Sequence, residues 1–160
     1  MARTTTEHTI VVQSSDLSSQ LRLEAVGTAK LYPGMLATIA GSGGKLKAHA
    51  KQGGATAKLF VLENQTPDTH TYPTTAAIDI PYAKADTVYY LQARPGDVIN
   101  ARLKDGQSVT KGIHWLISGA GGLLISCGTG ISVGTSNPVG IAWETVAASG
   151  TFARCKVRIV

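Results

Sequence analysis

The residues of this chain that could do chemistry are two cysteines, four histidines and ten acidic residues, so their spacing decides what they can form. Cys127 and Cys155 make no C-x-x-C pair, and the histidines lack the mutual spacing of metal ligands: they are His8, His49, His70 and His114. We therefore expect no metal site. Because a chain without an export signal normally keeps its thiols reduced, we expect two buried free cysteines, although they could pair if their strands are neighbours.

The carboxylates and His114 do not indicate catalysis. Asp79 with Asp86, or Asp97 with Asp105, could in principle act as acid and base, but each aspartate is better explained as a turn residue. His114 lies in an apolar run, which favours a packed histidine over a catalytic base. A Ser-His-Asp assembly would need partners far apart in the chain, which the sequence does not place together. We therefore expect that the protein is not an enzyme.

Two glycine-rich segments have only a superficial likeness to nucleotide-binding loops. Residues 40–45 lack the first glycine and the final hydroxyl residue of a phosphate-binding loop, and residues 119–122 lack the last glycine of a dinucleotide-binding motif. Both segments are predicted to be turns. Lys111 and Gly112 are similar to the turn of biotinyl and lipoyl carrier domains, but the residues that flank the modified lysine there are missing. We therefore expect no cofactor.

Short strands must position these residues. Between Thr87 and Cys127, four apolar segments are separated by turns at residues 94–97, 104–107 and 119–122, a pattern that predicts a β meander. Further strands are expected at residues 21–29, 36–40, 45–49, 58–64, 139–146 and 152–160, although residues 21–26 could instead begin a helix. The sequence thus predicts an all-β fold, a small β barrel or sandwich of short antiparallel strands. A barrel would best remove the edges of so many short strands.

Composition divides the chain into a flexible N-terminal arm, residues 1–20, and a single β-barrel-like domain, residues 21–160. The arm is rich in Thr, Ser and Gln, so it can bury little surface by itself. Residues 65–75 contain two prolines and are expected to project as a loop. No segment approaches the roughly 18 apolar residues of a membrane helix, and no signal-peptide core follows Met1. We therefore expect a soluble, unexported chain that has no membrane partner.

The net charge of +5 comes from 15 Lys and Arg against 10 Asp and Glu. Part of the excess lies in the last strand, where Arg154, Lys156 and Arg158 alternate with apolar residues and give the strand one basic and one apolar face. This basic face is either simply solvated or attracted to an acidic partner surface. The few aromatic residues do not interleave with the basic ones along the sequence, which argues against a nucleic-acid partner.

Six short motifs follow one another along the chain: Tyr32-Pro33-Gly34-Met35, Phe60-Val61-Leu62-Glu63-Asn64, Tyr82-Ala83-Lys84-Ala85-Asp86-Thr87-Val88, Asp105-Gly106-Gln107-Ser108-Val109-Thr110-Lys111-Gly112, Val139-Gly140-Ile141-Ala142-Trp143-Glu144 and Lys156-Val157-Arg158-Ile159-Val160. In this order they resemble the small head decoration proteins, or capsid cement proteins, of tailed bacteriophages. The resemblance covers residues 21–160.

The resemblance implies a β-barrel-like homotrimer, made in the host cytoplasm, that sits in the virion on the outer surface of the expanded head. Its partner there would be the major capsid protein, whose lattice it would stabilise. The N-terminal arm would order on that partner, with residues 10–12 adding a strand to an exposed sheet edge. The expected capsid contacts come from this arm and from the basic last strand: Arg3, Ile10, Val11, Val12, Arg154, Lys156 and Arg158.

Two other function classes stay open at this stage. A virion-associated β module that binds host-surface glycan would be favoured by exposed aromatic residues clustered between Gln65 and Tyr82. An enzyme or carrier domain would need a pocket with converging polar side chains.

Overall fold

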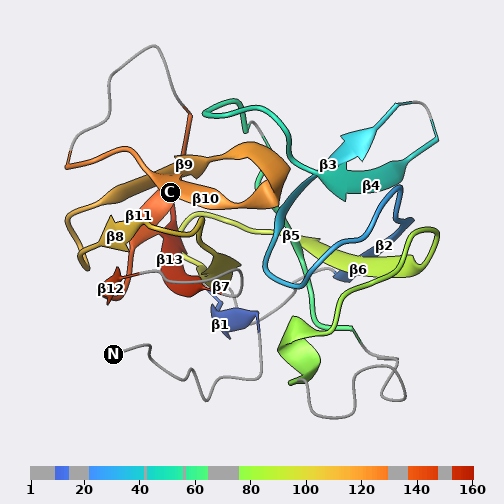
Figure 1. Ribbon diagram of the computed structural model, residues 1–160, viewed down its shortest axis with the longest axis horizontal. Coiled ribbons are helices and arrows are strands. Elements are labelled where there is room, and N and C mark those ends of the chain that lie inside the picture. The colour runs from blue at the N-terminus through green and yellow to red at the C-terminus, as the bar shows by residue number, and fades with distance from the viewer. Residues whose placement is uncertain are drawn as a thin grey trace.

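The computed structural model describes residues 10–14, 22–41, 43–55, 57–64, 76–129, 137–147 and 153–160. This part of the chain contains 13 short strands and two single-turn 3-10 helices. Every strand pairs antiparallel with its sheet neighbours, so the all-β, antiparallel class predicted from the sequence is confirmed. The strands form two lobes that lie side by side (Figure 1).

The large lobe contains a six-stranded sheet and a two-stranded sheet. The six-stranded sheet has the order β1 (Val11–Gln13), β7 (Val98–Arg102), β13 (Arg154–Ile159), β11 (Pro138–Ala142), β9 (Trp115–Ser118) and β10 (Leu124–Ser126). The two-stranded sheet pairs β12 (Val146–Ala147) with β8 (Ser108–Val109).

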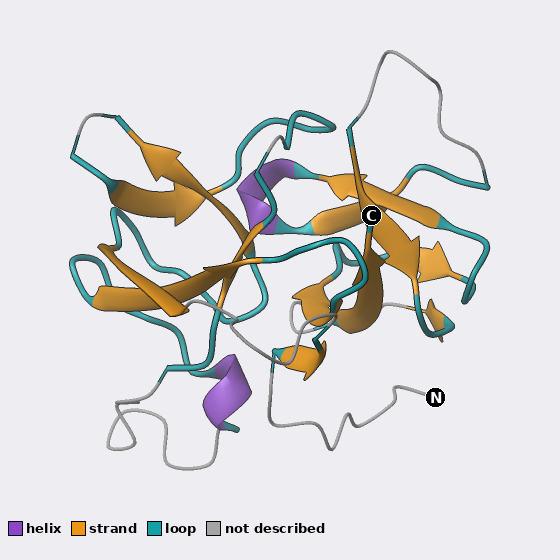
Figure 2. Cartoon of the chain, turned by 180° about the vertical axis from the view of Figure 1, so that it is seen from behind, coloured by secondary structure: helices purple, strands orange, loops and turns teal. Residues whose placement is uncertain are grey.

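The small lobe is a five-stranded sheet. Its order is β2 (Arg22–Val26), β6 (Thr87–Gln92), β5 (Leu59–Val61), β3 (Leu36–Ala40) and β4 (Lys45–Ala48). The 3-10 helix η1 (Ala77–Asp79) precedes β6, and η2 (Ala120–Gly122) joins β9 to β10. Seen from behind, η2 lies at the boundary between the lobes (Figure 2), where Gly122 donates its N–H to the carbonyl of His49 at 2.8 Å.

Both the six-stranded and the five-stranded sheet curl, so that segments from opposite ends of each strand order come close together. In the small lobe a single parallel bridge joins Gly27 to Leu46, and in the large lobe another joins Leu103 to Leu124. One bridge is much less than a paired strand, so within the described residues neither sheet closes into a barrel. The barrel alternative is therefore not found, whereas short, strongly curled antiparallel sheets are.

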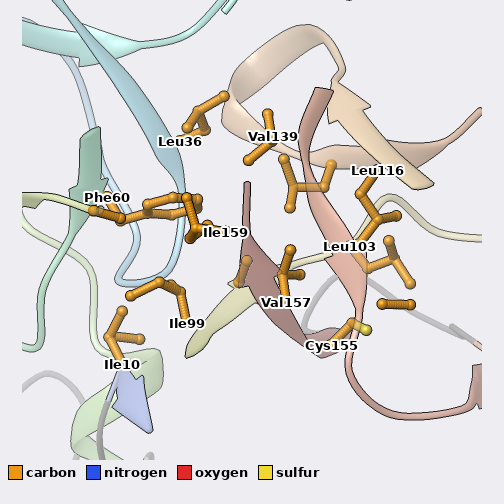
Figure 3. Close-up of a cluster of buried hydrophobic side chains, with 14 of the residues drawn as sticks. Ile10, Leu36, Phe60, Ile99, Leu103, Leu116, Val139, Cys155, Val157 and Ile159 are labelled. Carbon is orange, nitrogen blue, oxygen red and sulfur yellow. The ribbon is translucent and has the colours of Figure 1, made fainter. Parts of the chain in front are cut away.

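Alternation along the strands builds a core that both lobes share. Strand β6 sends Val88 and Tyr90 into a cluster inside the small lobe, and Leu91, on its other face, into a larger cluster. This larger cluster reaches from Leu36 and Phe60 of the small lobe to the inner face of the large lobe (Figure 3). Each buried aliphatic or aromatic side chain contributes about 2 kcal/mol, so the shared cluster holds the two lobes together.

The predicted meander is wrong in its connections. Strands β6 and β7 follow each other closely in sequence but belong to different sheets. The turn between them is attached to the end of β13, because Gly96 donates to Ile159 O and Ile159 donates to Asp97 O, both at 2.9 Å. Strand β7 therefore continues beside β13 and not beside β6. The strand expected at residues 108–118 is also interrupted, by a turn at residues 111–113.

Part of the predicted N-terminal arm belongs to the fold. Strand β1 pairs with β7, with Val11 opposite Ile99 and Gln13 opposite Val98. Ile10 is completely buried in the shared core, and its N–H donates to Oε1 of Glu63. The segment at residues 65–75, expected to project as a loop, lies outside the described residues.

Candidate functional site: a basic surface around two tryptophans

The last strand has the two faces that its sequence predicts. Cys155, Val157 and Ile159 of β13 are buried in the core, while Arg158 is exposed on the opposite face and Lys156 is half-buried. On that outer face the strand register places Arg158 opposite Ile141 of β11. Ile141 is in turn opposite Trp115, the first residue of β9. A row of one basic, one aliphatic and one aromatic side chain therefore crosses three strands.

Trp143, which follows β11, lies on the same face between two cations. The Nζ atom of Lys111 is 5.1 Å from the centre of the Trp143 ring, and Cζ of Arg158 is also 5.1 Å from it. Each cation–π contact at such an exposed site contributes about 0.5–1 kcal/mol. These residues form what we call the tryptophan surface: Lys111, Trp115, Ile141, Trp143, Lys156 and Arg158.

Hydrogen bonds hold the turn that carries Lys111 against the strand end that carries Trp143. Gly112 donates to Ala142 O at 2.8 Å, and Ala142 donates to His114 O at 2.9 Å. The N–H of Lys111 donates to Oγ1 of Thr145 at 3.1 Å. Gly112 has φ of 71°, a left-handed conformation that suits glycine and makes this tight turn possible. The surface is thus fixed before it meets a partner, which lowers the entropy cost of binding.

The charge of the tryptophan surface is positive. It holds three cations, whereas the nearest carboxylate in sequence, that of Glu144, is 7% exposed and accepts the N–H of Lys156 at 2.9 Å. Tryptophan and arginine are the residues that most often dominate protein interfaces, particularly where apolar contacts lie inside a polar rim. Such an arrangement can bind an acidic protein surface that presents apolar side chains at its centre.

At the Arg154 end of β13, on the face that also carries Lys156 and Arg158, the small lobe covers β13 and its neighbour β7. The side chains of Arg154 and Arg102 are 3% and 2% exposed, and both bind Oδ1 of Asp79, at 2.9 Å and 3.1 Å. Arg102 also donates from Nε to Pro33 O at 3.0 Å, and Arg154 from Nη2 to Ile78 O at 2.6 Å. Burial lowers the pKa of both guanidinium groups, that of Arg102 to about 10, with the Arg154 charge as the second cause. Both stay charged at neutral pH, so this buried cluster joins the lobes electrostatically.

The predicted capsid contacts separate into three groups. Arg158 and Lys156 belong to the tryptophan surface. Arg154 is interior, and so is Ile10, so neither side chain is offered to a partner in this conformation. Val11 is half-buried on the edge strand β1, Val12 is 36% exposed there, and Arg3 lies outside the described residues.

Sequence reasoning missed Lys111, Trp115 and Trp143 as surface residues. It held that aromatic and basic residues do not interleave, which is correct along the chain. In space, however, Lys111 and Arg158 flank Trp143, because β11 pairs with β13 and the 111–113 turn is fixed to the end of β11. No local pattern in the sequence indicates that these three segments lie together.

The four aspartates considered for acid–base chemistry have structural roles here. Three aspartates do close turns, as predicted: Asp86 accepts from Ala83 N at 2.6 Å, Asp97 from Arg94 N at 2.8 Å and Asp105 from Gly106 N at 2.9 Å. Residues 40–45 and 119–122 are the predicted turns, joining β3 to β4 and β9 to β10.

The cysteines are free, with Cys155 buried and Cys127 half-buried. Burial, followed by the charge of Glu144, raises the pKa of Cys155 to about 12, so its thiol stays protonated and unreactive. Within the described residues, no group of three or more His, Cys, Asp and Glu side chains could hold a metal ion. Nor does any helix there have the length and apolar character needed to cross a membrane.

Comparison with known proteins adds no relatives: no protein-family model matches the sequence, and no curated protein matches it. The functional argument therefore depends on the tryptophan surface and on the motifs of the chain itself.

Proposed function

We propose that this protein is a structural virion protein that binds the outer surface of the expanded head of a tailed bacteriophage and stabilises the lattice of the major capsid protein. The tryptophan surface is the observation that carries this proposal. It is rigid, basic and aromatic, and it includes Lys156 and Arg158, two of the contacts expected from the resemblance to head decoration proteins.

An interface of ordinary size would suffice for such binding. A stable protein–protein contact covers about 800 Å² of each partner, which is about a tenth of the 8298 Å² accessible surface of this chain. Trp143 would supply the central apolar contact, and its flanking cations would exclude water around it. The cations would also accelerate association with an acidic capsid surface, because opposite potentials steer the encounter.

Stabilisation of the head follows from selective binding. A protein that binds the expanded lattice and not the unexpanded one shifts the equilibrium toward expansion by mass action. A homotrimer would engage several capsid subunits at once, so modest contacts would gain from high effective concentration. The partner is thus the major capsid protein together with two further copies of this chain.

Among the described residues between Gln65 and Tyr82, no exposed aromatic cluster supports the glycan-binding alternative. Tyr82 is 1% exposed, and its hydroxyl donates to Glu63 O at 2.8 Å, so it offers no stacking surface. Tyr72 lies outside the described residues. We therefore propose the capsid role alone.

A co-sedimentation experiment tests the proposal. Purified protein is mixed with expanded and with unexpanded heads of the phage that encodes it, and the pellets are analysed. We expect saturable binding to expanded heads and little binding to unexpanded ones. The absence of binding to both, or equal binding to both, would contradict a role in cementing the expanded lattice.

A further inference from the structure

A pocket of about 380 Å³ lies between the lobes, away from the tryptophan surface. The small lobe contributes Tyr32 and Met35 to its wall, from the turn that enters β3. The large lobe contributes the end of β7, the turn after it, and one residue before β10: Arg102, Leu103, Lys104, Asp105 and Leu123. In the sheet, Arg102 is opposite Arg154, which lies four residues before Arg158 on β13. About 13 Å of strand therefore separates the pocket from the tryptophan surface.

The wall of this pocket is mainly apolar. Met35, Leu103 and Leu123 line it together with the ring of Tyr32. The position of that ring is fixed, since Cζ of Arg102 lies 4.6 Å from its centre and Nζ of Lys30 lies 5.3 Å from it. A preformed cavity with an apolar wall and few polar groups is the usual form of a small-ligand site, and this one is near the lower end of the common size range.

The charge around the pocket favours an anion. Two cations line it, Arg102 and Lys104, and a third, Lys30, lies over the Tyr32 ring, whereas the one carboxylate among the lining residues, that of Asp105, accepts the N–H of Gly106 at 2.9 Å. Arg102 directs Nε to Pro33 O and Nη2 to Asp79, so the Asp79 carboxylate offsets part of its charge and the contact with a ligand falls to Lys104. Lys104 is exposed at the pocket and can bring its ammonium group to a ligand.

We infer that this pocket binds an apolar group that carries a carboxylate, the chemistry of a peptide carboxyl terminus with an aromatic or aliphatic last residue and of a free small carboxylate. The apolar part contacts Met35, Leu103, Leu123 and the Tyr32 ring, while the carboxylate meets Lys104. This site is independent of the proposed capsid interface, because it shares no residue with the tryptophan surface.

The test is a titration of the ¹⁵N-labelled full chain followed by two-dimensional NMR. The probes are N-acetyl-phenylalanine, its neutral amide, and a hexapeptide with a free carboxyl-terminal phenylalanine. We expect the acid to shift the backbone signals of Leu103, Lys104 and Leu123 with Kd of about 1 mM, and to bind at least about tenfold more tightly than the amide. Lys104→Glu should weaken binding of the acid at least about fivefold, and the matched exposed-turn variant Lys84→Glu should not.

The three probes also identify the source of the ligand. Tighter binding of the hexapeptide than of N-acetyl-phenylalanine assigns the pocket to a peptide terminus, and equal binding assigns it to a free carboxylate. The inference is overturned if acid and amide bind equally, if the shifts fall outside the pocket, if Lys104→Glu has no effect, or if no shift occurs at about 10 mM acid. Both lysines are exposed, so these variants should keep the wild-type spectrum elsewhere.

Discussion

Replacing Asp79 by asparagine should destabilise the protein far more than an ordinary surface substitution. Asp79 is 26% exposed, yet its Oδ1 atom is the shared acceptor of two guanidinium groups that are 2% and 3% exposed. Asparagine keeps the shape of the side chain and removes its charge. Two buried cations, Arg102 and Arg154, would then face each other without the carboxylate between them.

The magnitude follows from the contacts that would survive. Removing one partner of a buried ion pair costs about 3–5 kcal/mol, because the remaining charge is left uncompensated. Here each arginine retains a backbone acceptor, Pro33 O for Arg102 and Ile78 O for Arg154, which reduces the cost. We therefore expect the free energy of unfolding to fall by about 3 kcal/mol.

Urea unfolding followed by tryptophan fluorescence measures this difference, with an unchanged slope as evidence that the unfolded state is the same. Asp86→Asn is the matched control, since Asp86 is exposed and accepts only the Ala83 N–H among the described contacts, at 2.6 Å. Its loss should cost about 1 kcal/mol. If the two variants differ by less than about 1 kcal/mol, the buried cluster does not join the lobes as we argue.

Three further predictions test the fold. Ile10→Ala should cost about 2–5 kcal/mol in urea unfolding because Ile10 is 0% exposed, whereas Val12→Ala, at 36% exposed, should cost about 0.5 kcal/mol; equal effects would remove β1 from the folded core. Gly34→Ala should cost at least about 2 kcal/mol, since its φ is +82° and a Cβ would lie 2.3 Å from Nη1 of Arg154. Gly106→Ala, with φ of +77° and open space, should cost about 1 kcal/mol, and a smaller loss at Gly34 would contradict the close approach. Burial lowers the pKa of His49 below 6.5, so stability should decline as the pH falls below about 6.5, and a His49→Gln variant that declines equally would refute this assignment.

The sequence predicts the strands of this protein better than their partners. Alternation along residues 154–160 correctly separates the buried Cys155, Val157 and Ile159 from the outer face of β13. The Pro95-Gly96 turn is also recognisable, but a turn motif does not say whether the next strand returns to the same sheet. That choice depends on hydrogen bonds to Ile159, more than 60 positions away, and no local pattern encodes them.

The same limit explains what was missed at the candidate sites. Asp79 has the sequence context of a turn residue, and its two arginine partners come from β7 and β13, at positions 102 and 154. Trp143 meets its cations from positions 111 and 158 only because three segments converge at one end of the sheet. Propensity and periodicity report local structure, whereas these clusters depend on strand order, which sequence patterns leave undetermined.

Binding of charge-reversed variants to expanded heads tests the central claim most directly. Lys111→Glu changes the cation beside Trp143, and Lys84→Glu makes the same change in an exposed turn of the small lobe. We predict that Lys111→Glu weakens binding at least about thirtyfold, a loss of about 2 kcal/mol, while Lys84→Glu binds like the wild type. Equal binding of both variants would show that the tryptophan surface does not contact the capsid.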